Sequence, residues 1–444
     1  MSLTDGIRFF AATDVGRVRD HNEDNYLVDR KLALFIVADG MGGHAAGEVA
    51  SALAVRTVHE ELRKQRQLVD DYEIGAKGAR AVSTREMLNL LEFAVQRACA
   101  RIHEEAMADA QKRGMGTTLS AMLFARDKAF VAHVGDSRIY QYRGGRVQQI
   151  TEDHTVFNEL LKRGKLTREQ IEKVAHKNAI TRAVGVYERV EVDTLAIEVL
   201  PGDAYLLCSD GLHGYLDDKH LDVLSVLEGY RPEDQAQAFI EHANARGGKD
   251  NITDVIVRVE AGDHDAERAR RLQAKRDTLA RMALFSRLSE RELLRVLQVA
   301  EIRDFARGEH VMREGERGDE LFVVLTGKVA VVRGEAVLTH LGPGEHVGEM
   351  ALIRAVPRSA DVIADVDSEL VAIKRADFFE ILRREHEIAI KFLWKFLGVL
   401  ADRLDQTSRE LRTAREHEGI EDITSEIFGE LDDDAPTGEH RRVD

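Results

Sequence analysis

Aspartates that stand next to glycine recur along the first 260 residues, and their side chains are well suited to binding metal ions. Hard divalent cations such as Mg²⁺ and Mn²⁺ take oxygen ligands, and their sites combine a few carboxylates with water. An aspartate at a strand end is held rigidly, and a following glycine lets the backbone carbonyl approach an ion. A single Asp-Gly pair also marks an ordinary turn, but several together predict a metal site. These aspartates are Asp39, Asp136 and Asp210, and two further carboxylates are Asp250 before Asn251 and Asp24 in the segment NEDN.

The elements that must position these side chains alternate between strand-like and helical patterns. A continuous apolar run, LALFIV, predicts a buried strand that leads directly into ADGMGGH. Further strands are predicted at 118–124, 128–134, 138–142, 192–199, 204–208 and 252–259. Helical periodicity predicts helices at 45–65, 85–113, 217–227 and 232–245. The pattern indicates an α+β domain with aspartates at strand ends.

Seven segments carry a more specific signal because of their order. They are DVGRVRDHNEDN, VADGMGGHAAGEVAS, MGTTLSA, HVGDSRIY, TEDHT, CSDGL and KDNIT. In this order the chain resembles the metal-dependent PPM (type 2C) protein Ser/Thr phosphatases, and the bacterial branch most closely, over residues 5–260. The resemblance implies an αββα sandwich that hydrolyses phosphoserine and phosphothreonine on proteins.

The resemblance also implies metal-binding roles, residue by residue, for two Mn²⁺ or Mg²⁺ ions and a third, weaker one. Asp39 would bridge two ions, with the Gly40 carbonyl on one of them. The remaining positions would be Asp210 and Asp250 on the second ion, Glu23 and Asp24 near the first largely through waters, and Asp136 on the third.

Catalysis by such a site follows from its charges. Two cations about 3.5–4 Å apart lower the pKa of a bridging water and stabilise the phosphoryl charge. The resemblance places Arg19 against the substrate phosphate, which a guanidinium matches well. His44 is a candidate general acid for the leaving oxygen. A surface histidine without a catalytic role stays open, because His44 follows MGG, whereas other branches have a histidine directly after Asp-Gly.

A covalent cysteine mechanism is the rival enzyme class. It requires a thiolate and an arginine about six residues later that closes a phosphate loop. Glu105 stands six residues after Cys99, and Gly214 stands six after Cys208. The sequence therefore disfavours this mechanism.

The segment from His154 to Val190 corresponds to the flap beside the active site in the resembled family. Its stretch KRGKLTREQIEKVAHKN is basic and could meet acidic phosphoprotein substrates. A solvated helix face explains the same charges, and the two interpretations remain open.

Residues 284–410 resemble a cyclic-nucleotide-binding domain, a β-roll with flanking helices. The supporting segments are VMREGERGDELFVVLTGKVAVV and HVGEMALIRAVPRSADVIA. The resemblance implies that Glu349 binds the ribose 2′-hydroxyl and Arg358 the cyclic phosphate, while Gly348 permits close approach and Ser359 adds a hydroxyl. A β-roll without ligand is the alternative. Between cAMP and cGMP the pattern favours cAMP without deciding.

Four segments divide the chain. We expect a phosphatase domain at 1–261, a charged helical or flexible linker at 262–282, a nucleotide-binding domain at 283–414 and a disordered acidic tail at 415–444. Near the end of the third segment, apolar residues at helical spacing predict core packing, with a dimer seam or a lid over the base as alternatives. They are Leu393, Phe396, Leu397, Leu400 and Leu404.

Composition bounds the remaining possibilities. A formal net charge of −16 argues against nucleic acid as a partner. Two cysteines cannot build a disulfide framework, which favours a reducing compartment. The start of the chain has no pattern of a signal peptide, and no run of ~18 apolar residues predicts a membrane span. We therefore expect a cytoplasmic phosphatase for substrates of Ser/Thr kinases, regulated by cyclic nucleotide, or alternatively a non-catalytic scaffold or sensor.

Overall fold

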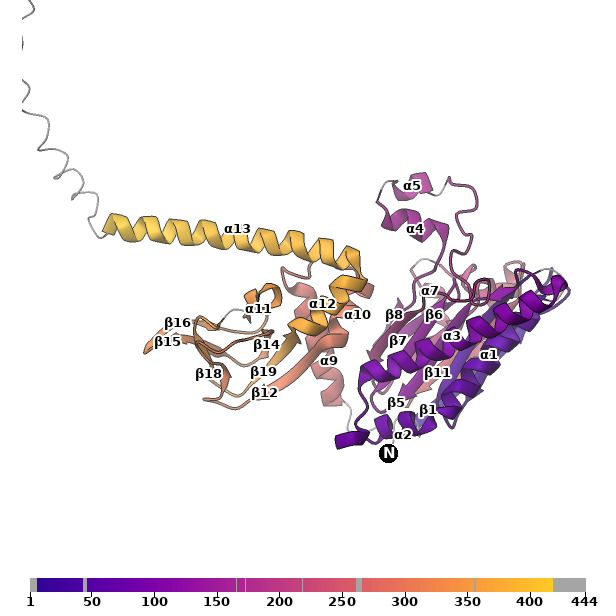
Figure 1. Ribbon diagram of the computed structural model, residues 1–444, viewed down its shortest axis with the longest axis horizontal. Helices are drawn as coiled ribbons and strands as arrows, with labels where there is room; N and C mark the ends of the chain where they lie inside the picture. The colour runs from indigo at the N-terminus through magenta and orange to yellow at the C-terminus, as the bar shows by residue number, and fades with distance from the viewer. Residues whose placement is uncertain are drawn as a thin grey trace, which may run out of the picture.

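The computed structural model describes residues 6–42, 46–164, 166–171, 173–217, 219–260, 266–354 and 357–417. Two domains lie side by side in it, with the helices α9 and α10 between them (Figure 1). The first domain is a four-layer αββα sandwich, and the second combines two small antiparallel sheets with helices. The predicted fold class, an αββα sandwich followed by a β-roll with flanking helices, is confirmed.

Two antiparallel sheets form the centre of the first domain. The first sheet has the order β1-β11-β10-β7-β8, and the second has the order β2-β3-β5-β6-β9 with β4 beside β3. The strands of the first sheet are β1 (Ile7–Asp14), β7 (Arg138–Arg143), β8 (Arg146–Gln149), β10 (Ala204–Cys208) and β11 (Ile252–Val259). Those of the second are β2 (Asp24–Asp29), β3 (Leu34–Met41), β4 (Gly116–Thr117), β5 (Leu119–Ala125), β6 (Lys128–Val134) and β9 (Asp193–Glu198).

The core lies on both faces of the second sheet, which explains the continuous apolar run in β3. Successive side chains of a strand point to opposite faces. Leu34 and Ile36 face the helices, whereas Phe35 and Val37 face the other sheet. Between the sheets, Phe124 of β5 contacts Tyr205 of β10 edge to face with ring centroids 5.5 Å apart, which helps to fix how the sheets pack.

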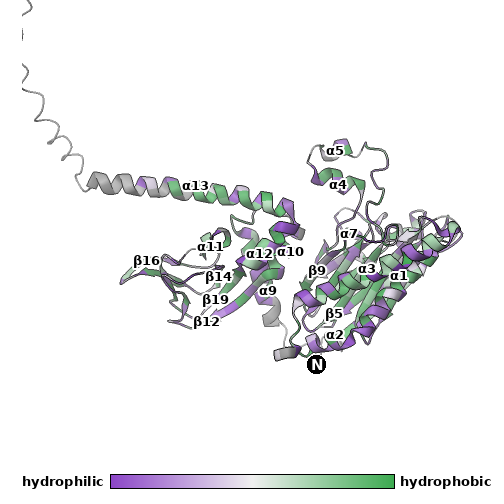
Figure 2. Ribbon diagram, in the orientation of Figure 1, coloured by the Kyte–Doolittle hydropathy of each residue, from purple (hydrophilic) through white to green (hydrophobic). Residues whose placement is uncertain are grey.

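Helices cover the outer faces of both sheets. Over the second sheet lie α1 (Ala46–Lys64), α2 (Arg66–Glu73) and α3 (Thr84–Ala108), and over the first lie α6 (Asp210–His213), α7 (Leu221–Gly229) and α8 (Gln235–Ala245). A capping box formed by Ser83 and Glu86 begins α3. Figure 2 shows mainly hydrophobic central strands, with hydrophilic residues on α1 and α2. Short 3₁₀ turns occupy Gly78–Arg80, Ala110–Lys112 and Pro232–Asp234.

The flap projects from the sandwich between β8 and β9. It contains α4 (Val156–Lys162) and α5 (Arg168–Ile171), which stand above the sheets in Figure 1. An isolated bridge between Thr155 and Ile180 closes its base, and the Thr155 side chain caps α4. The two ends of the flap therefore lie side by side where it joins the sandwich.

The second domain begins with α9 (Ala266–Arg281) and α10 (Glu290–Val299), the latter capped by Ser289. One of its sheets has the order β12-β19-β14-β17 and the other the order β13-β18-β15-β16. Leu279 of α9 lies in the core of this domain, so the C-terminal part of the expected linker packs as a helix there. The strands are β12 (Ala300–Phe305), β13 (His310–Met312), β14 (Glu320–Thr326), β15 (Val329–Arg333), β16 (Ala336–Leu341), β17 (His346–Val347), β18 (Asp361–Ala364) and β19 (Ser368–Lys374).

Three helices complete the second domain: α11 (Met350–Ile353), α12 (Arg375–Arg384) and α13 (His386–His417). Core packing was the expectation for five apolar residues of α13, and it holds for Phe396 and Leu400. It is wrong for Leu393, Leu397 and Leu404, which are 48%, 60% and 70% exposed. These leucines alternate along α13 with the buried Phe392 and Phe396, so they lie on a side of the helix that faces away from the core.

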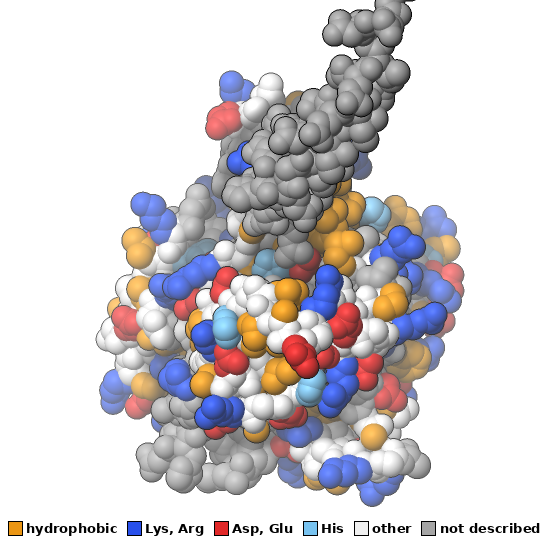
Figure 3. All heavy atoms as spheres, turned by 90° about the vertical axis from the view of Figure 1, so that its left-hand side faces the viewer, with side chains coloured by type: hydrophobic (Ala, Val, Ile, Leu, Met, Phe, Trp, Pro, Cys, Tyr) orange, Lys and Arg blue, Asp and Glu red, His pale blue; other side chains and the backbone are white. Residues whose placement is uncertain are grey.

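The surface of the second domain carries charges of both signs. In the face shown in Figure 3, acidic and basic side chains alternate with hydrophobic ones. Within the described ranges, no helix has the length and apolar character needed to cross a bilayer. The predicted tail lies outside the described residues from position 418 onwards.

Candidate active site

Two carboxylates come together through strand register. Asp24 of β2 stands directly opposite Asp39 of β3 in an antiparallel pair. The backbone of Asp39 is fixed by two threonines: its N–H donates to Thr118 Oγ1 (2.9 Å), and its carbonyl accepts from Thr117 Oγ1 (2.8 Å). The MGTTLSA segment thus holds the end of β3 in place.

Close backbone packing brings Glu23 to the same place. A Cβ at Gly40 would lie 2.5 Å from the Glu23 carbonyl and 2.2 Å from the Gly47 carbonyl at the start of α1. The Gly40 N–H donates to the Glu23 carbonyl at 3.2 Å. Glycine at position 40 is therefore required by contact, because any side chain would push α1 away from Glu23.

The turn from β10 into α6 supplies Asp210. Ser209, one residue earlier, donates its hydroxyl to Asp24 Oδ2 at 2.7 Å. Asp210 lies close enough to Asp39 for its charge to raise the pKa of the Asp39 carboxyl. The first and second sheets therefore meet at Asp24, Asp39 and Asp210.

Asp136 follows β6 after a glycine whose conformation is required. Gly135 has φ of +104°, and a Cβ there would lie 2.6 Å from the Thr118 side chain. The Asp136 carbonyl accepts a hydrogen bond from His213 Nε2 at 2.9 Å. Burial, followed by the charge of Arg138, lowers the pKa of His213 to about 4, so this imidazole is neutral at pH 7.

Asp250 lies at the start of the turn before β11 and is bound by Arg19. The guanidinium donates to Asp250 Oδ2 at 2.7 Å, and both side chains are partly exposed. Asn251 joins the same region, because its side chain accepts from the Glu23 N–H and donates to the Val15 and His21 carbonyls. Arg19 thus stands at the solvent side of the carboxylate group.

The electrostatics of the carboxylates are those of a site deficient in positive charge. Burial raises the pKa of Asp24 and of Asp136, each to about 7, with the charge of Asp210 as a further cause. Burial and the charges of Asp24, Asp210 and Asp136 raise the pKa of Asp39 well above its usual range. Burial, followed by the charge of Asp250, also raises that of Asp210. A cation would relieve this repulsion.

The donor set fits a hard divalent ion. Asp24 Oδ1 and Asp136 Oδ1 are buried in the described structure without a hydrogen-bond partner, which is costly unless something else binds them. Among the described residues, no three acidic, histidine or cysteine side chains form a complete ligand cage. Magnesium and manganese do not require one, because they commonly keep several waters and use one or two carboxylates.

Two other predicted candidates have different outcomes. His44 lies outside the described residues. Cys99 and Cys208 are both buried, and burial raises the pKa of each thiol. A reactive thiolate at either position is therefore disfavoured by the structure as well as by the sequence.

Four residues that support the site were not predicted from the sequence: Thr117, Thr118, Ser209 and His213. Each lies inside or directly beside a recognised segment, and His213 comes three residues after Asp210, within the same helical turn. Proximity to a motif was the available signal, but their partners lie 78, 79, 185 and 77 residues away in the chain.

A second cluster lies in the C-terminal domain, at the predicted nucleotide residues. Gly348 has φ of +82°, and a Cβ there would lie 2.5 Å from the Arg358 guanidinium. Arg358 donates to the Glu320 carbonyl at 2.7 Å, and Glu349 is buried at the start of α11. Burial lowers the pKa of Arg358, although the charges of Glu320, Asp319 and Glu349 oppose this. The Ser359 carbonyl accepts a hydrogen bond from Arg333 Nε at 3.0 Å.

Two known families match the chain, one over each domain. The model of the family described as "Protein phosphatase 2C" matches residues 17–254, and that described as "Cyclic nucleotide-binding domain" matches residues 302–385. The serine/threonine phosphatase stp of Listeria innocua is 37% identical over 249 residues, which are 55% of this chain and 93% of that protein. The serine/threonine protein phosphatase PstP of Mycobacterium tuberculosis is 38% identical over 254 residues, 57% of this chain and 45% of PstP.

Solved structures resemble the N-terminal part of the chain. A crystal structure of PstP/Ppp from Mycobacterium tuberculosis has a TM-score of 0.49 and 37% identity, covering 57% of this chain and 99% of that one. A structure of the PstP catalytic domain in complex with two manganese ions has a TM-score of 0.47 and 35% identity, covering 57% and 99%.

Proposed function

Because this chain belongs to the protein phosphatase 2C family and is a serine/threonine phosphatase, we propose that it hydrolyses phosphoserine and phosphothreonine on proteins with divalent Mn²⁺ or Mg²⁺. The main support for a metal site is that Asp24, Asp39, Asp136 and Asp210 lie close together. Two of their buried oxygens, Asp24 Oδ1 and Asp136 Oδ1, have no hydrogen-bond partner among the described residues. Such a cluster is stable at neutral pH only when it is protonated or bound to cations.

The proposed roles follow from the positions of the side chains. Asp39 lies at the centre of the cluster and would bridge two ions, with the Gly40 carbonyl beside it. Asp210 and Asp250 would be ligands of one ion. Asp24 and Glu23 would act on the other ion, largely through waters, and Asp136 would bind a third ion. When bound, the ions would lower the pKa of a water and stabilise the negative phosphoryl group.

Arg19 would bind the substrate phosphate. In the structure it is bound to Asp250, and half of its side chain is exposed to solvent. A guanidinium can donate to a carboxylate and a phosphate at once through separate N–H groups. His44 remains the proposed general acid.

The experiment that tests this function uses the full-length protein and a phosphothreonine peptide. Hydrolysis should require Mn²⁺ or Mg²⁺ and should stop in excess chelator, while alkylation of thiols should leave it unchanged. Full turnover in chelator would exclude the metal mechanism, and loss on alkylation would favour the rejected thiolate. Substrates phosphorylated by Ser/Thr kinases are the expected physiological targets.

We further propose that the C-terminal domain, residues 283–414, binds a cyclic nucleotide and thereby regulates the phosphatase domain at residues 1–261. The support is the cluster of Gly348, Glu349 and Arg358. The backbone at Gly348 lies against the Arg358 guanidinium, and the Glu349 carboxylate is close enough for its charge to act on that guanidinium. Arg358 would pair with the cyclic phosphate and Glu349 with the ribose, and cAMP is the favoured ligand over cGMP.

Calorimetric titration of the intact protein with each nucleotide, paired with phosphatase assays, tests this regulation. Binding of either nucleotide together with a change in hydrolysis rate supports it. If neither nucleotide binds at millimolar concentration, the domain acts only as a β-roll. Regulation also requires that the nucleotide prefer one arrangement of the protein over another.

A further inference from the structure

Helix α10 of the C-terminal domain packs against an edge strand of the phosphatase domain. β9 is the last strand of the second sheet, so one side of its backbone has no neighbouring strand. Leu294 of α10 packs against the core between the two phosphatase sheets. The carbonyl of Thr194 in β9 accepts a hydrogen bond from the Arg295 guanidinium. An unpaired strand edge offers such carbonyls, and here a helix of the other domain binds one.

Arg295 is also held from its own domain. Its Nε pairs with Glu385 at 3.2 Å, and only 14% of its side chain is exposed. Glu385 lies at the junction between α12 and α13, because α12 ends at Arg384 and α13 begins at His386. The guanidinium therefore joins this helix junction to the first residues of β9.

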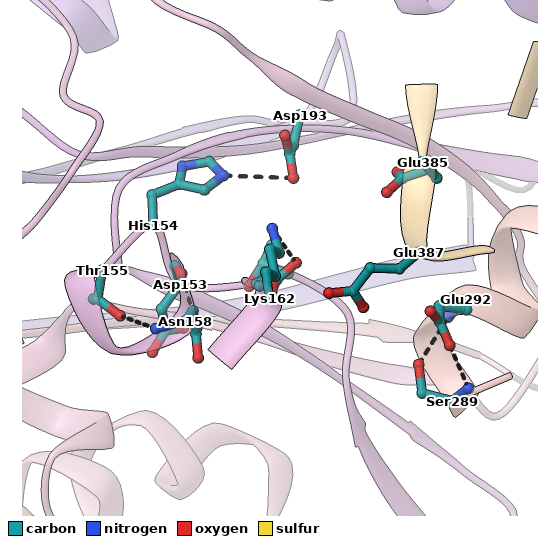
Figure 4. Close-up of polar contacts among 12 residues, drawn as sticks. Asp153, His154, Thr155, Asn158, Lys162, Asp193, Ser289, Glu292, Glu385 and Glu387 are labelled. Atoms are coloured by element: carbon teal, nitrogen blue, oxygen red, sulfur yellow. Dashed lines mark hydrogen bonds and ion pairs between the residues drawn. The ribbon is translucent and has the colours of Figure 1, made fainter. Parts of the chain in front are cut away.

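The residue next to Thr194 continues this connection into the phosphatase domain. Asp193 accepts from Arg182 at 3.1 Å and lies 3.5 Å from His154 Nε2, as Figure 4 shows for His154. Burial alone would raise the pKa of Asp193, but the hydrogen bond from His154, with the charge of Arg295 as a further cause, lowers it below its usual range. Asp193 thus experiences cations from both domains.

His154 connects Asp193 to the site and to the flap. Its Nδ1 accepts from the Gly135 N–H at 3.0 Å, so its Nε2 carries hydrogen and faces Asp193. Gly135 directly precedes Asp136, and the Gly135 carbonyl accepts from the His154 N–H at 2.8 Å. The His154 carbonyl accepts from Thr181 at the returning end of the flap. His154 therefore contacts the Asp136 loop through its imidazole and its backbone N–H, and the root of the flap through its backbone carbonyl.

We propose that Arg295 is a positioning residue for the phosphatase, which holds Asp193 and Thr194 and, through His154, fixes the flap root and the Asp136 loop. The C-terminal domain thereby acts on the active site through the contact of Arg295 with Glu385. This proposal rests on the proposed phosphatase function. It differs from simple adhesion between domains, because it specifies which part of the catalytic domain responds.

A matched control is available in an ion pair that joins the two domains elsewhere. Arg85 at the start of α3 binds Glu380 of α12 at 3.2 Å, and Arg85 is exposed. Its loss weakens contact between the domains without touching β9, His154 or the flap. A role limited to adhesion would make Arg85→Ala and Arg295→Ala alike.

The test compares Arg295→Ala, Arg85→Ala and the unmutated full-length protein at saturating Mn²⁺, with a phosphothreonine peptide and with p-nitrophenyl phosphate. A displaced flap root should lower kcat/KM for the peptide more than for the small ester, so that their ratio falls about three- to tenfold in Arg295→Ala. Arg85→Ala should keep the original ratio. Arg295→Lys should recover part of it, because an ammonium can still donate to the Thr194 carbonyl.

The outcomes separate the two proposals. An unmutated protein without metal-dependent hydrolysis would refute the phosphatase function itself. An active unmutated protein with an unchanged ratio in Arg295→Ala, or with equal changes in Arg85→Ala, would overturn the role of Arg295. If Arg295→Ala does not fold, Arg295→Gln provides the test, and an unchanged ratio in it would likewise reject the proposal.

Discussion

Replacing Asp136 by asparagine should stabilise the metal-free protein above neutral pH, although it removes a proposed metal ligand. Asp136 is 8% exposed, and its Oδ1 has no partner among the described residues. Burial and the charges of Asp210 and Asp153 raise its pKa from 3.8 to about 7. The metal-free folded state therefore keeps a proton that the unfolded chain loses between about pH 4 and pH 7.

The sign and size of the effect follow from this difference. Because the folded state binds more protons, the free energy of unfolding falls as pH rises through this window. One pKa unit corresponds to about 1.4 kcal/mol, so a shift of this size gives at most about 4 kcal/mol at pH 8. Asparagine cannot ionise, so Asp136→Asn should remove this cost, gaining stability at pH 8 and little at pH 4.

The assay is urea unfolding in chelator at pH 5 and pH 8, followed by far-UV circular dichroism. Trp394, the only tryptophan in the chain, lies in α13, so its fluorescence reports the C-terminal domain separately. Added Mn²⁺ should stabilise the unmutated protein more than the variant. A metal-free variant that is less stable than the unmutated protein at pH 8 would refute the reasoning.

Asp153→Asn is the matched control with the opposite sign. Burial would raise the pKa of Asp153, but three hydrogen bonds from Arg138 and its charge lower it below the usual value. Its stabilising contribution is present above the unfolded-state pKa and is lost in acid. This variant should therefore be destabilised at pH 8, where Asp136→Asn is stabilised.

Three further substitutions test the proposed roles. Asp39→Ala should abolish hydrolysis of a phosphopeptide, because Asp39 lies at the centre of the carboxylate cluster; near-normal rates would contradict the site. Arg19→Ala should mainly raise KM, with a smaller loss in kcat, and steady-state kinetics showing the reverse would exclude phosphate binding as its main role. Arg358→Ala should keep basal hydrolysis but erase the response to cyclic nucleotide, and calorimetry showing unchanged nucleotide affinity would count against its assignment.

Residue type and local order were enough to predict the family, the carboxylates and the two kinds of domain. The aspartates of the first domain sit in short segments such as VADG and CSDG, whose chemistry can be read without long-range information. Apolar runs and helical periodicity likewise predicted most strands and helices of the sandwich, because these signals depend on neighbours along the chain. The residues proposed for the nucleotide cluster could also be named from short segments of the sequence.

Contacts between distant segments were decided only by the tertiary structure. The β2–β3 register sets Asp24 opposite Asp39, and Ser209 reaches Asp24 across 185 residues. The connection from Arg295 to Thr194 spans 101 residues and two domains. Residue type alone does not predict these hydrogen-bond partners, since arginine and serine are common surface residues.

The exposed leucines of α13 are a second case in which the sequence did not predict a tertiary contact. Helical spacing predicted that Leu393, Leu397 and Leu404 would lie on one helix, and they do. Spacing determines which residues share a face, because helix geometry is local. Whether that face is covered depends on which side of the helix lies against the domain, which is a property of the packed chain and not of the spacing.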